Sequence, residues 1–394
     1  SHPDLIPNLW KNYNEIPGNG IDDDGNGYID DVRGWNAYES NDNVSHNVDW
    51  GEGHGSAVAG IVGAKGNNNN GVAGVNWDVK IMAVKGGGAE SEAIEAYSYV
   101  LENRKLYNST DGEKGAFVVS TNASWGVDGG TAASAPLWCA MYDTLGNHGV
   151  LSAGATANAN VNVDVDGDLP TQCASPFLIS VTNTTITDTK EGEAGYGTTS
   201  IDLGAPGSGV WTVDQFSNGY DAFGGTSGAT PHVAGTIGLL YSVPCLSFAN
   251  LAKSNPKLAA EKVRDFILNG VDANASLAGI TVTGGRLNVN NAVQNLVEDC
   301  APVSIEEERE PFTGVTLYPN PVTGDILNLS YNSEVAQEGT LQVTDLAGKV
   351  IYELPLSISN GQNKITIDLP QLANGIYSLS IVSNTGSINL KFIK

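Results

Sequence analysis

The chain has 394 residues, of which 41% are hydrophobic, and a formal net charge of −25. This length allows two or three domains, and the apolar share suffices for a sizeable core. The charge argues against nucleic acids and anionic membranes as partners, because both would repel the surface. No apolar run approaches the roughly 20 residues of a membrane span, and residues 1–4 lack the basic start of a signal peptide.

Residues 1–78 are rich in Gly, Asn and Asp and are predicted to be mostly loops. Beyond them, short apolar runs alternate with amphipathic stretches, which is typical of βαβ units and a largely parallel sheet with helices on both faces. We therefore expect an α/β domain over residues 1–300. Its predicted strands are 80–84, 117–121, 150–153, 178–182 and 201–203, and its predicted helices are 89–105, 131–148, 230–241, 256–268 and 286–297.

The pattern changes near Cys300. Residues 301–314 contain the charged, proline-terminated stretch IEEEREP, which is typical of a linker. Residues 315–394 contain only short strand-like runs separated by turn-forming pairs such as Asn-Gly, and these predict a small all-β sandwich. The runs are 315–318, 326–331, 340–345, 349–353, 364–368, 376–383 and 388–393.

The four cysteines are widely spaced and form no CxxC pair of the kind that binds zinc. An even number of such cysteines suits two disulfides in an oxidising compartment. Three pairings are open, and we favour the sequential one, Cys139–Cys173 and Cys245–Cys300. Four buried free thiols are the alternative.

Two glycine-rich segments carry the residues best suited to catalysis. GEGHGSAVAGIVGA places His54 ahead of a run of small residues, and GGTSGATPHVAGTIGLLY places Ser227 at a helix start. A serine hydroxyl needs a base to take its proton, and histidine suits this because its pKa lies near neutrality. A helix beginning at Ser227 would hold Pro231 in its first turn and direct backbone N–H groups at developing negative charge. Taken singly, His54 would be an ordinary polar residue of the surface and Ser227 would be the N-cap of a helix.

Together, GHGSAVAGIVGA and GTSGATPHVAG resemble the histidine and serine segments of the subtilisin-like serine proteases, over residues 1–299. The resemblance implies a subtilisin-like parallel sheet with helices on both faces. It also implies a secreted endopeptidase that cleaves protein or peptide substrates through an acyl-enzyme. In that scheme His54 is the general base and Ser227 is the nucleophile.

The segment GVLSAGATAN resembles the family strand that ends in Ala-Ala-Gly-Asn. This resemblance makes Asn158 the side-chain donor of the oxyanion hole, with the Ser227 backbone N–H as the second donor. Ala157 stands where the family has glycine. A shifted register, in which Asn160 is the donor, is therefore the alternative.

The tripeptide Ser124-Trp125-Gly126 resembles the family's Ser-Leu-Gly strand, which pairs with the substrate backbone. Trp125 is larger than the usual residue at its position, so the substrate preference is expected to differ. An ordinary core role for Trp125 is the alternative.

The catalytic aspartate of the family lies on a strand just ahead of a loop ending in His-Pro-Asp-Leu. The given sequence starts Ser1-His2-Pro3-Asp4-Leu5, so we expect the aspartate and its strand upstream of Ser1, with Asp4 a loop residue that does not replace it. Loss of this aspartate from subtilisin costs about 3 × 10⁴ in kcat. A fragment of this extent is therefore expected to be nearly inactive. The alternative function is an inactive protease fold used for binding or adhesion.

The stretch GIDDDGNGYIDD resembles the first half of an oxygen-ligand calcium loop. Asp22, Asp24 and Asn26 alternate as such ligands do, and Asp30 or Asp31 would supply further charge, so calcium is the expected structural cofactor. A solvated acidic turn is the alternative. A second acidic run, Asp164, Asp166 and Asp168, is a weaker candidate for another ion.

The segments LYPNP, VTDLAGKVI and LANGIYSLSI resemble the C-terminal sorting domain of the type IX secretion system, over residues 315–394. The resemblance implies export across an outer membrane by that machinery, and hence a secreted or cell-surface protein. A generic adhesion sandwich is the alternative.

Overall fold

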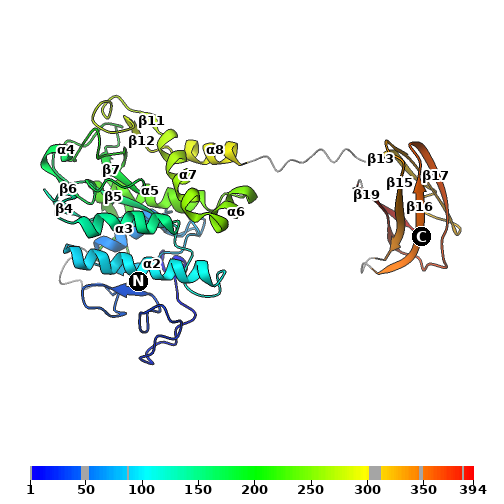
Figure 1. Ribbon diagram of the computed structural model, residues 1–394, viewed down its shortest axis with the longest axis horizontal. Coiled ribbons are helices and arrows are strands. Elements are labelled where there is room, and N and C mark those ends of the chain that lie inside the picture. The colour runs from blue at the N-terminus through cyan, green and yellow to red at the C-terminus, as the bar shows by residue number, and fades with distance from the viewer. Residues whose placement is uncertain (1, 46–52, 87, 301–311, 346–348, 384–385) are drawn as a thin grey trace. The chain divides into compact units, whose positions relative to one another are not determined.

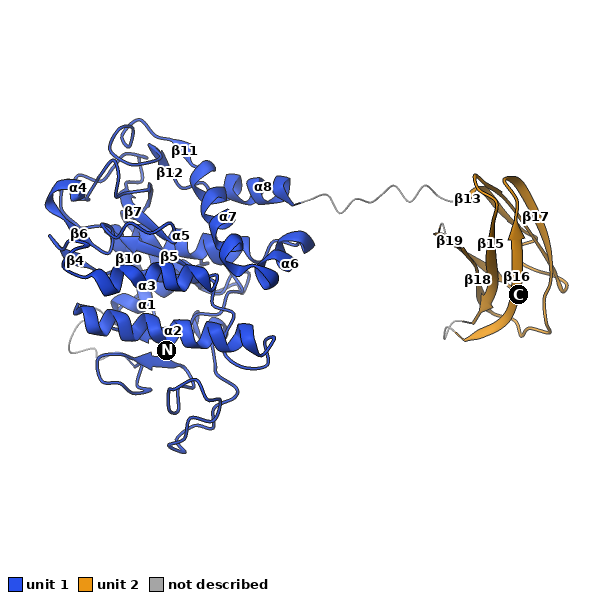
Figure 2. Ribbon diagram, in the orientation of Figure 1, with its two compact units in different colours: residues 1–301 blue, residues 302–394 orange. Residues whose placement is uncertain are grey.

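The computed structural model divides into two compact units, Ser1–Ala301 and Pro302–Lys394, shown in Figures 1 and 2. The residues that the structure describes are 2–45, 53–86, 88–300, 312–345, 349–383 and 386–394.

A six-stranded sheet in the order β11-β12-β8-β7-β5-β3 forms the centre of the first unit. All neighbouring pairs are parallel except β11 with β12 at one edge. The central strand β7 is buried along its whole length, as expected for a parallel sheet covered on both sides. The strands are β3 (Ser120–Ala123), β5 (Leu151–Ala155), β7 (Leu178–Thr184), β8 (Leu203–Pro206), β11 (Asp272–Ala273) and β12 (Gly285–Arg286).

Helices cover both faces of this sheet, which confirms the predicted architecture (Figure 1). Neighbouring side chains of a strand point to opposite faces. Accordingly, Ile179 and Val181 join the cluster built on α5, whereas Leu178 joins the cluster of α2 and α3. The helices are α2 (Glu90–Ser109), α3 (Pro136–Asn147), α5 (Thr226–Leu240), α6 (Leu246–Ser254), α7 (Pro256–Asn269) and α8 (Val289–Asp299).

A separate two-stranded parallel sheet joins β1 (Gly34–Asn36) to β2 (Ala83–Lys85). Gly34 has a φ of +137°, and a Cβ there would lie 1.8 Å from the Ala83 carbonyl oxygen, so this close pairing requires glycine. Within the described residues, β2 pairs only with β1, and β3 pairs only with β5. Each therefore keeps one edge without a strand partner.

Two disulfides join Cys139 to Cys173 and Cys245 to Cys300, so the favoured sequential pairing is the observed one. The first lies between α3 and the segment ahead of β7, and the second fastens the start of α6 to the end of α8. The Cys245 sulfur also accepts the Phe248 N–H and so caps α6. That short helix is absent from the sequence prediction.

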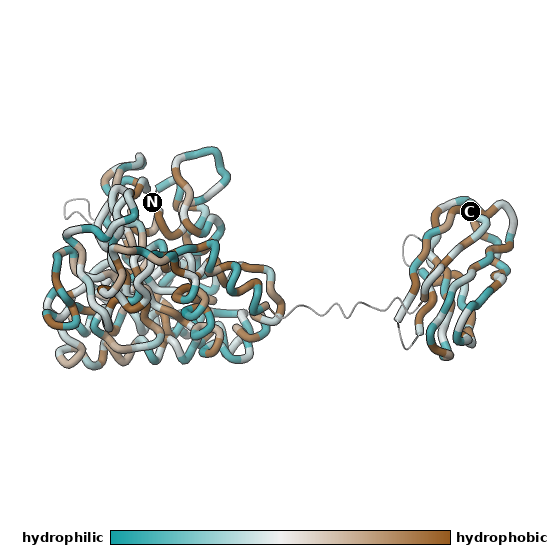
Figure 3. The backbone as a smooth tube through the Cα atoms, turned by 90° about the horizontal axis from the view of Figure 1, so that it is seen from above, coloured by the Kyte–Doolittle hydropathy of each residue, from teal (hydrophilic) through white to brown (hydrophobic). Residues whose placement is uncertain are grey.

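The described part of the second unit contains seven antiparallel strands, and each corresponds to one predicted run. They make a three-stranded sheet, β13-β14-β17, and a four-stranded sheet, β16-β15-β18-β19, around one shared core. Figure 3 shows apolar and polar segments alternating along these strands, as a sheet with one buried face requires. The strands are β13 (Phe312–Tyr318), β14 (Ile326–Ser333), β15 (Gln337–Thr344), β16 (Val350–Ile358), β17 (Gly361–Asp368), β18 (Ile376–Ser383) and β19 (Gly386–Ile393).

No helix in the described part of the chain combines the length and the hydrophobicity that a membrane span requires.

Candidate active site

Ser227 lies in the first turn of α5, the helix that crosses the centre of the sheet. Helix α5 begins at Thr226, four residues earlier than the apolar periodicity predicted. Gly225 precedes it with a φ of +82°, and a Cβ there would lie 2.7 Å from the Asn158 side-chain oxygen. Glycine thus permits both the turn into the helix and the close approach of Asn158.

Pro231 lies beyond the first turn of α5, not within it as the sequence suggested. Proline has no N–H, so the carbonyl of Ser227, four residues earlier, loses its helical donor. The Ser124 hydroxyl donates to that carbonyl instead, at 3.0 Å. In return, the Ser227 hydroxyl donates to the Ser124 carbonyl, at 3.1 Å. This reciprocal pair fastens the start of α5 to the chain just beyond β3.

Asn158 follows β5 at the carboxyl edge of the sheet. Its side-chain oxygen accepts hydrogen bonds from the Thr226 N–H at 2.9 Å and the Thr226 hydroxyl at 3.1 Å. With the oxygen held in this way, the amide NH₂ remains available to the pocket that Asn158 lines with Ser227. Asn160 does not line this pocket; it accepts a hydrogen bond from Lys190 at 3.4 Å. The geometry therefore favours Asn158 over Asn160 as an oxyanion donor.

A pocket of about 110 Å³ opens beside Ser227. The predicted substrate strand lies along it, because Ser124, Trp125 and Gly126 are all in its lining. Trp125 is half-buried and its ring stacks on Trp138, with centroids 5.1 Å apart. Trp125 thus contributes to both the core and the pocket wall. The remaining lining residues are Asp128, Ala155, Thr156, Ala157, Asn158, Asp168 and Thr226.

His54 is the first residue of α1 (His54–Gly63), which packs against α5. The edge of its ring contacts Phe223, with centroids 5.2 Å apart, and Phe223 lies four residues before Ser227. Burial lowers the pKa of His54 from its ordinary value of 6.5. Among the described residues, its imidazole has no hydrogen bond, either to Ser227 or to a carboxylate.

His54, Ser124 and Trp125 also line a groove of about 1710 Å³ that contains the unpaired edges of β2 and β3. Its other walls are largely apolar and come from residues 2–10, α1, α2 and α5. Two of the residues that line it carry a buried polar atom, Ser120 Oγ and Asn122 Oδ1, with no hydrogen-bond partner in the described structure. Buried polar atoms in this condition are rare in folded proteins. The groove therefore has two strand edges with which an additional strand could pair.

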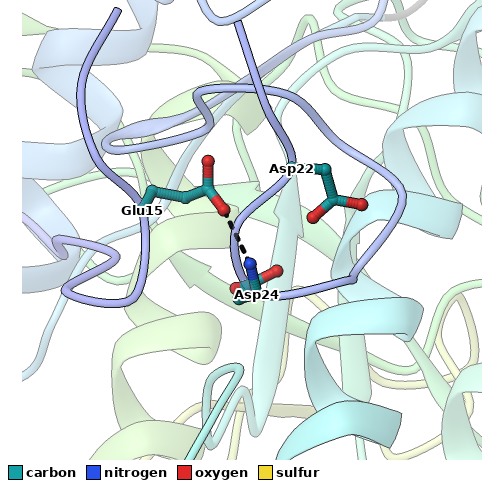
Figure 4. Close-up of side chains that lie close together, drawn as sticks. All are labelled: Glu15, Asp22 and Asp24. Atoms are coloured by element: carbon teal, nitrogen blue, oxygen red, sulfur yellow. Dashed lines mark hydrogen bonds between the residues drawn. The ribbon is translucent and has the colours of Figure 1, made fainter. Parts of the chain in front are cut away.

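The acidic loop brings together a set of carboxylates that differs from the predicted one. Asp22 and Asp24 lie with Glu15, which the sequence analysis missed, and ligand oxygens of the three are within 4.8 Å of one another (Figure 4). Glu15 accepts the Asp23, Asp24 and Asp30 backbone N–H groups and so holds the loop around itself. Its pKa is raised, first by burial and then by the charge of Asp24.

The other two predicted ligands have different partners. Asn26 donates to Asp24 at 3.5 Å and to Asp31 at 3.0 Å, so its side chain braces the cluster. Asp30 turns away to accept the Asn19 and Gly20 N–H groups and is not in the cluster. Burial raises the pKa of Asp31 to about 6. The cluster fits an oxygen-ligand cation, because three carboxylates this close repel one another without one.

The second acidic run does not converge on one point in the described structure. Asp164 accepts hydrogen bonds from the Thr198 hydroxyl and the Thr199 and Ser200 N–H groups. Asp168, by contrast, lies in the lining of the pocket beside Ser227. The described structure therefore does not bring these three carboxylates together as one cluster.

Comparison with known proteins finds two families. The model described as "Subtilase family" matches residues 1–292, and the "Secretion system C-terminal sorting domain" matches residues 316–394. Thermitase of Thermoactinomyces vulgaris is 31% identical, with 67% of this chain and 81% of thermitase covered. An extracellular protease of Xanthomonas campestris pv. campestris is also 31% identical, with 62% and 42% covered.

Subtilisin-like protease 1 of Plasmodium berghei is 26% identical, with 75% of this chain and 48% of that protein covered. The chain thus spans under half the length of the first curated relatives it matches. Among solved structures, a cold-adapted subtilisin-like serine proteinase aligns with a TM-score of 0.46 at 23% identity, covering 65% of this chain and 78% of that one.

The Ser124–Ser227 pair predicts a coupling between Ser124 and Pro231. Ser124→Ala leaves the buried Ser227 carbonyl without a donor, which should cost about 1–3 kcal/mol in the free energy of unfolding. Pro231→Ala supplies an N–H to that carbonyl. In the Pro231→Ala protein, Ser124→Ala should therefore lower the free energy of unfolding by clearly less. The measurement is a double-mutant cycle by denaturant unfolding.

Ser254→Ala is the matched control, because its hydroxyl also donates to a helix carbonyl but is exposed. It should change stability by less than about 0.5 kcal/mol in either background. An equal cost of Ser124→Ala with and without Pro231 would contradict this account of the helix start.

Proposed function

The chain belongs to the subtilase family, and on this basis we propose that it is a serine endopeptidase acting through an acyl-enzyme. Ser227 is the nucleophile, His54 is the general base, and Asn158 is an oxyanion donor. The observation that carries the proposal is that Ser227, in the first turn of α5, shares one pocket with the Asn158 amide. First-turn N–H groups have no helical partner and favour negative charge nearby.

The reaction proceeds by attack of Ser227 Oγ on the scissile carbonyl carbon while the hydroxyl proton passes to His54. The carbonyl electron pair moves to oxygen, which the Asn158 NH₂ and the Ser227 N–H stabilise. Collapse of this intermediate breaks the C–N bond, and the amine leaves with the proton from His54. Water then attacks the ester in the same way and regenerates the Ser227 hydroxyl. Residues 124–126 would pair with the substrate backbone.

We place the acidic partner of His54 in the groove between β2 and β3. A strand there would pair with both unpaired edges and join the two parallel sheets into one. Its end would lie near His54, which lines the same groove. Residues 2–10 line the groove too, which suits a strand that immediately precedes them. A carboxylate on it would orient the imidazole and stabilise its protonated form.

Calcium is the cofactor that we propose for the loop of residues 15–31. Glu15, Asp22 and Asp24 would supply carboxylate oxygens, the ligands that this ion prefers. Asn26 supports the cluster through Asp24, and Asp30 supports it by fixing the loop at Asn19 and Gly20. The ion would offset the repulsion within the cluster and so stabilise a segment that forms little regular structure.

The sorting-domain match indicates a secreted or cell-surface protein. We propose that residues 316–394 are recognised by the type IX secretion machinery and take no part in hydrolysis. In support, they form a compact unit separate from the one that carries Ser227 and His54.

The role of the groove is tested by comparing a chain that starts at residue 1 with one that also carries the residues encoded immediately before it. The longer chain should have a kcat/KM for a peptide ester about 10⁴-fold higher, because its His54 gains an acidic partner. The His54 pKa, followed by NMR, should be higher in the longer chain, since a nearby carboxylate favours the protonated form.

Ser227→Ala in the longer chain is the control and should abolish hydrolysis. Equal kcat/KM values and equal His54 pKa values in the two chains would show that the groove does not house the acidic partner. A raised pKa without hydrolysis in either chain would support the binding-protein alternative.

The calcium proposal predicts that a chelator lowers the melting temperature by roughly 5 °C, since a ligand at a hundred times its Kd contributes about 2.7 kcal/mol. Asp24→Asn should remove most of this response and, in chelator, be at least as stable as the parent because it relieves repulsion. Asp111→Asn, in an exposed turn, is the matched control. An identical melting curve with and without chelator would leave the acidic loop as solvated surface.

A further inference from the structure

Two carboxylates lie in the pocket beside Ser227. Asp128 is in β4 (Val127–Asp128) and Asp168 is in β6 (Asp168–Leu169), and the two residues are directly opposite each other in an antiparallel pair. Both line the pocket together with Ser227, Asn158 and Trp125. They come from segments 40 positions apart, so the sequence gives no sign that they meet.

Asp168 is only 1% exposed, and hydrogen bonds hold its side chain in place. One of its oxygens accepts the Thr171 hydroxyl at 2.5 Å and the Ala157 N–H at 3.2 Å. Burial raises its pKa to about 6, so it is still largely ionised at neutral pH. Among the described residues, no lysine, arginine or histidine forms an ion pair with Asp168 or Asp128. Burying an ionised carboxylate without a cation costs free energy, and a positively charged partner usually offsets that cost.

We propose that this pocket selects a lysine or arginine side chain on the substrate residue whose carbonyl Ser227 attacks. The inference rests on the proposed function and adds a substrate class to it. The residue under attack has its carbonyl at Ser227 and Asn158, so its side chain is the one nearest the pocket that these two residues line. Asp168 would pair with its positive charge from inside the pocket, and exposed Asp128 would add to the attraction.

The walls suit the rest of such a side chain. The Trp125 ring, backed by Trp138, offers an apolar surface to the methylene stem and a π face to the cation. Gly126 allows the chain to pass close to β6, because a Cβ there would lie 2.0 Å from the Leu169 carbonyl oxygen. The volume of about 110 Å³ is several times what one water needs, so a side chain can enter. An apolar side chain would instead leave the Asp168 carboxylate without a positive partner.

The test has two arms. In the first, the active longer chain is given peptides that differ only at the residue before the cleaved bond: Arg, Lys, Leu, Phe or Glu. We expect kcat/KM for Arg and Lys to exceed that for Leu and Phe by roughly tenfold to a hundredfold. Asp168→Asn should reduce this ratio at least tenfold and Asp128→Asn should reduce it less. Asn keeps an oxygen for Thr171 and Ala157.

The second arm measures binding of benzamidine, an aromatic amidinium, by calorimetry and needs no turnover. Asp168→Asn should weaken its Kd at least tenfold, whereas Asp166→Asn, an exposed residue of the same acidic run outside the pocket, should leave the Kd unchanged. This arm therefore decides the charge preference of the pocket even if no peptide is cleaved and the proposed function fails.

A preference for Leu or Phe in the parent, or unchanged benzamidine binding in both Asp168→Asn and Asp128→Asn, would overturn the proposal. So would a pocket that binds Ca²⁺ in competition with benzamidine, because the carboxylates would then serve a metal.

Discussion

The exchange of hydrogen bonds between Ser124 and Ser227 fixes the geometry on which the rest of the site depends. Pro231 deprives the Ser227 carbonyl of its helical donor, and the Ser124 hydroxyl replaces it. The start of α5 is thereby tied to the end of β3, the strand beside the groove. Because the Asn158 side-chain oxygen accepts the Thr226 N–H at the same helix start, three separate segments meet at Ser227. None of these contacts involves His54, whose own position depends on α1 and Phe223.

The unpaired edges of β2 and β3 impose the second constraint. A parallel strand is stable only with partners or cover, and an edge left open invites another strand. Ser124 and His54 both line this groove, so whatever fills it contacts both. In this account, a strand that pairs with β2 and β3 would also orient the His54 imidazole. Ser124 and Trp125 also line the pocket beside Ser227, so the groove and that pocket share part of their walls.

The sequence was most informative where function depends on a continuous segment. The runs around His54, Ser227 and Asn158 identified the family, and apolar periodicity located most helices and strands of both units. Prediction from the sequence failed where residues distant in the chain come together. Glu15 joins Asp22 and Asp24 through backbone hydrogen bonds, and Asp128 meets Asp168 through strand pairing, and neither contact leaves a local pattern. The predicted start of helix α5 was four residues too late, because the segment TSGAT lacks the apolar spacing on which the prediction relied.

The central claim is that Ser227 is the nucleophile of this site. The most direct test is to treat the chain, in a form that hydrolyses a peptide, with a serine-directed phosphonate and locate the adduct by mass spectrometry. The account predicts one adduct, on Ser227, that forms in step with the loss of hydrolysis. An adduct on a different serine, or full hydrolysis with Ser227 modified, would contradict it.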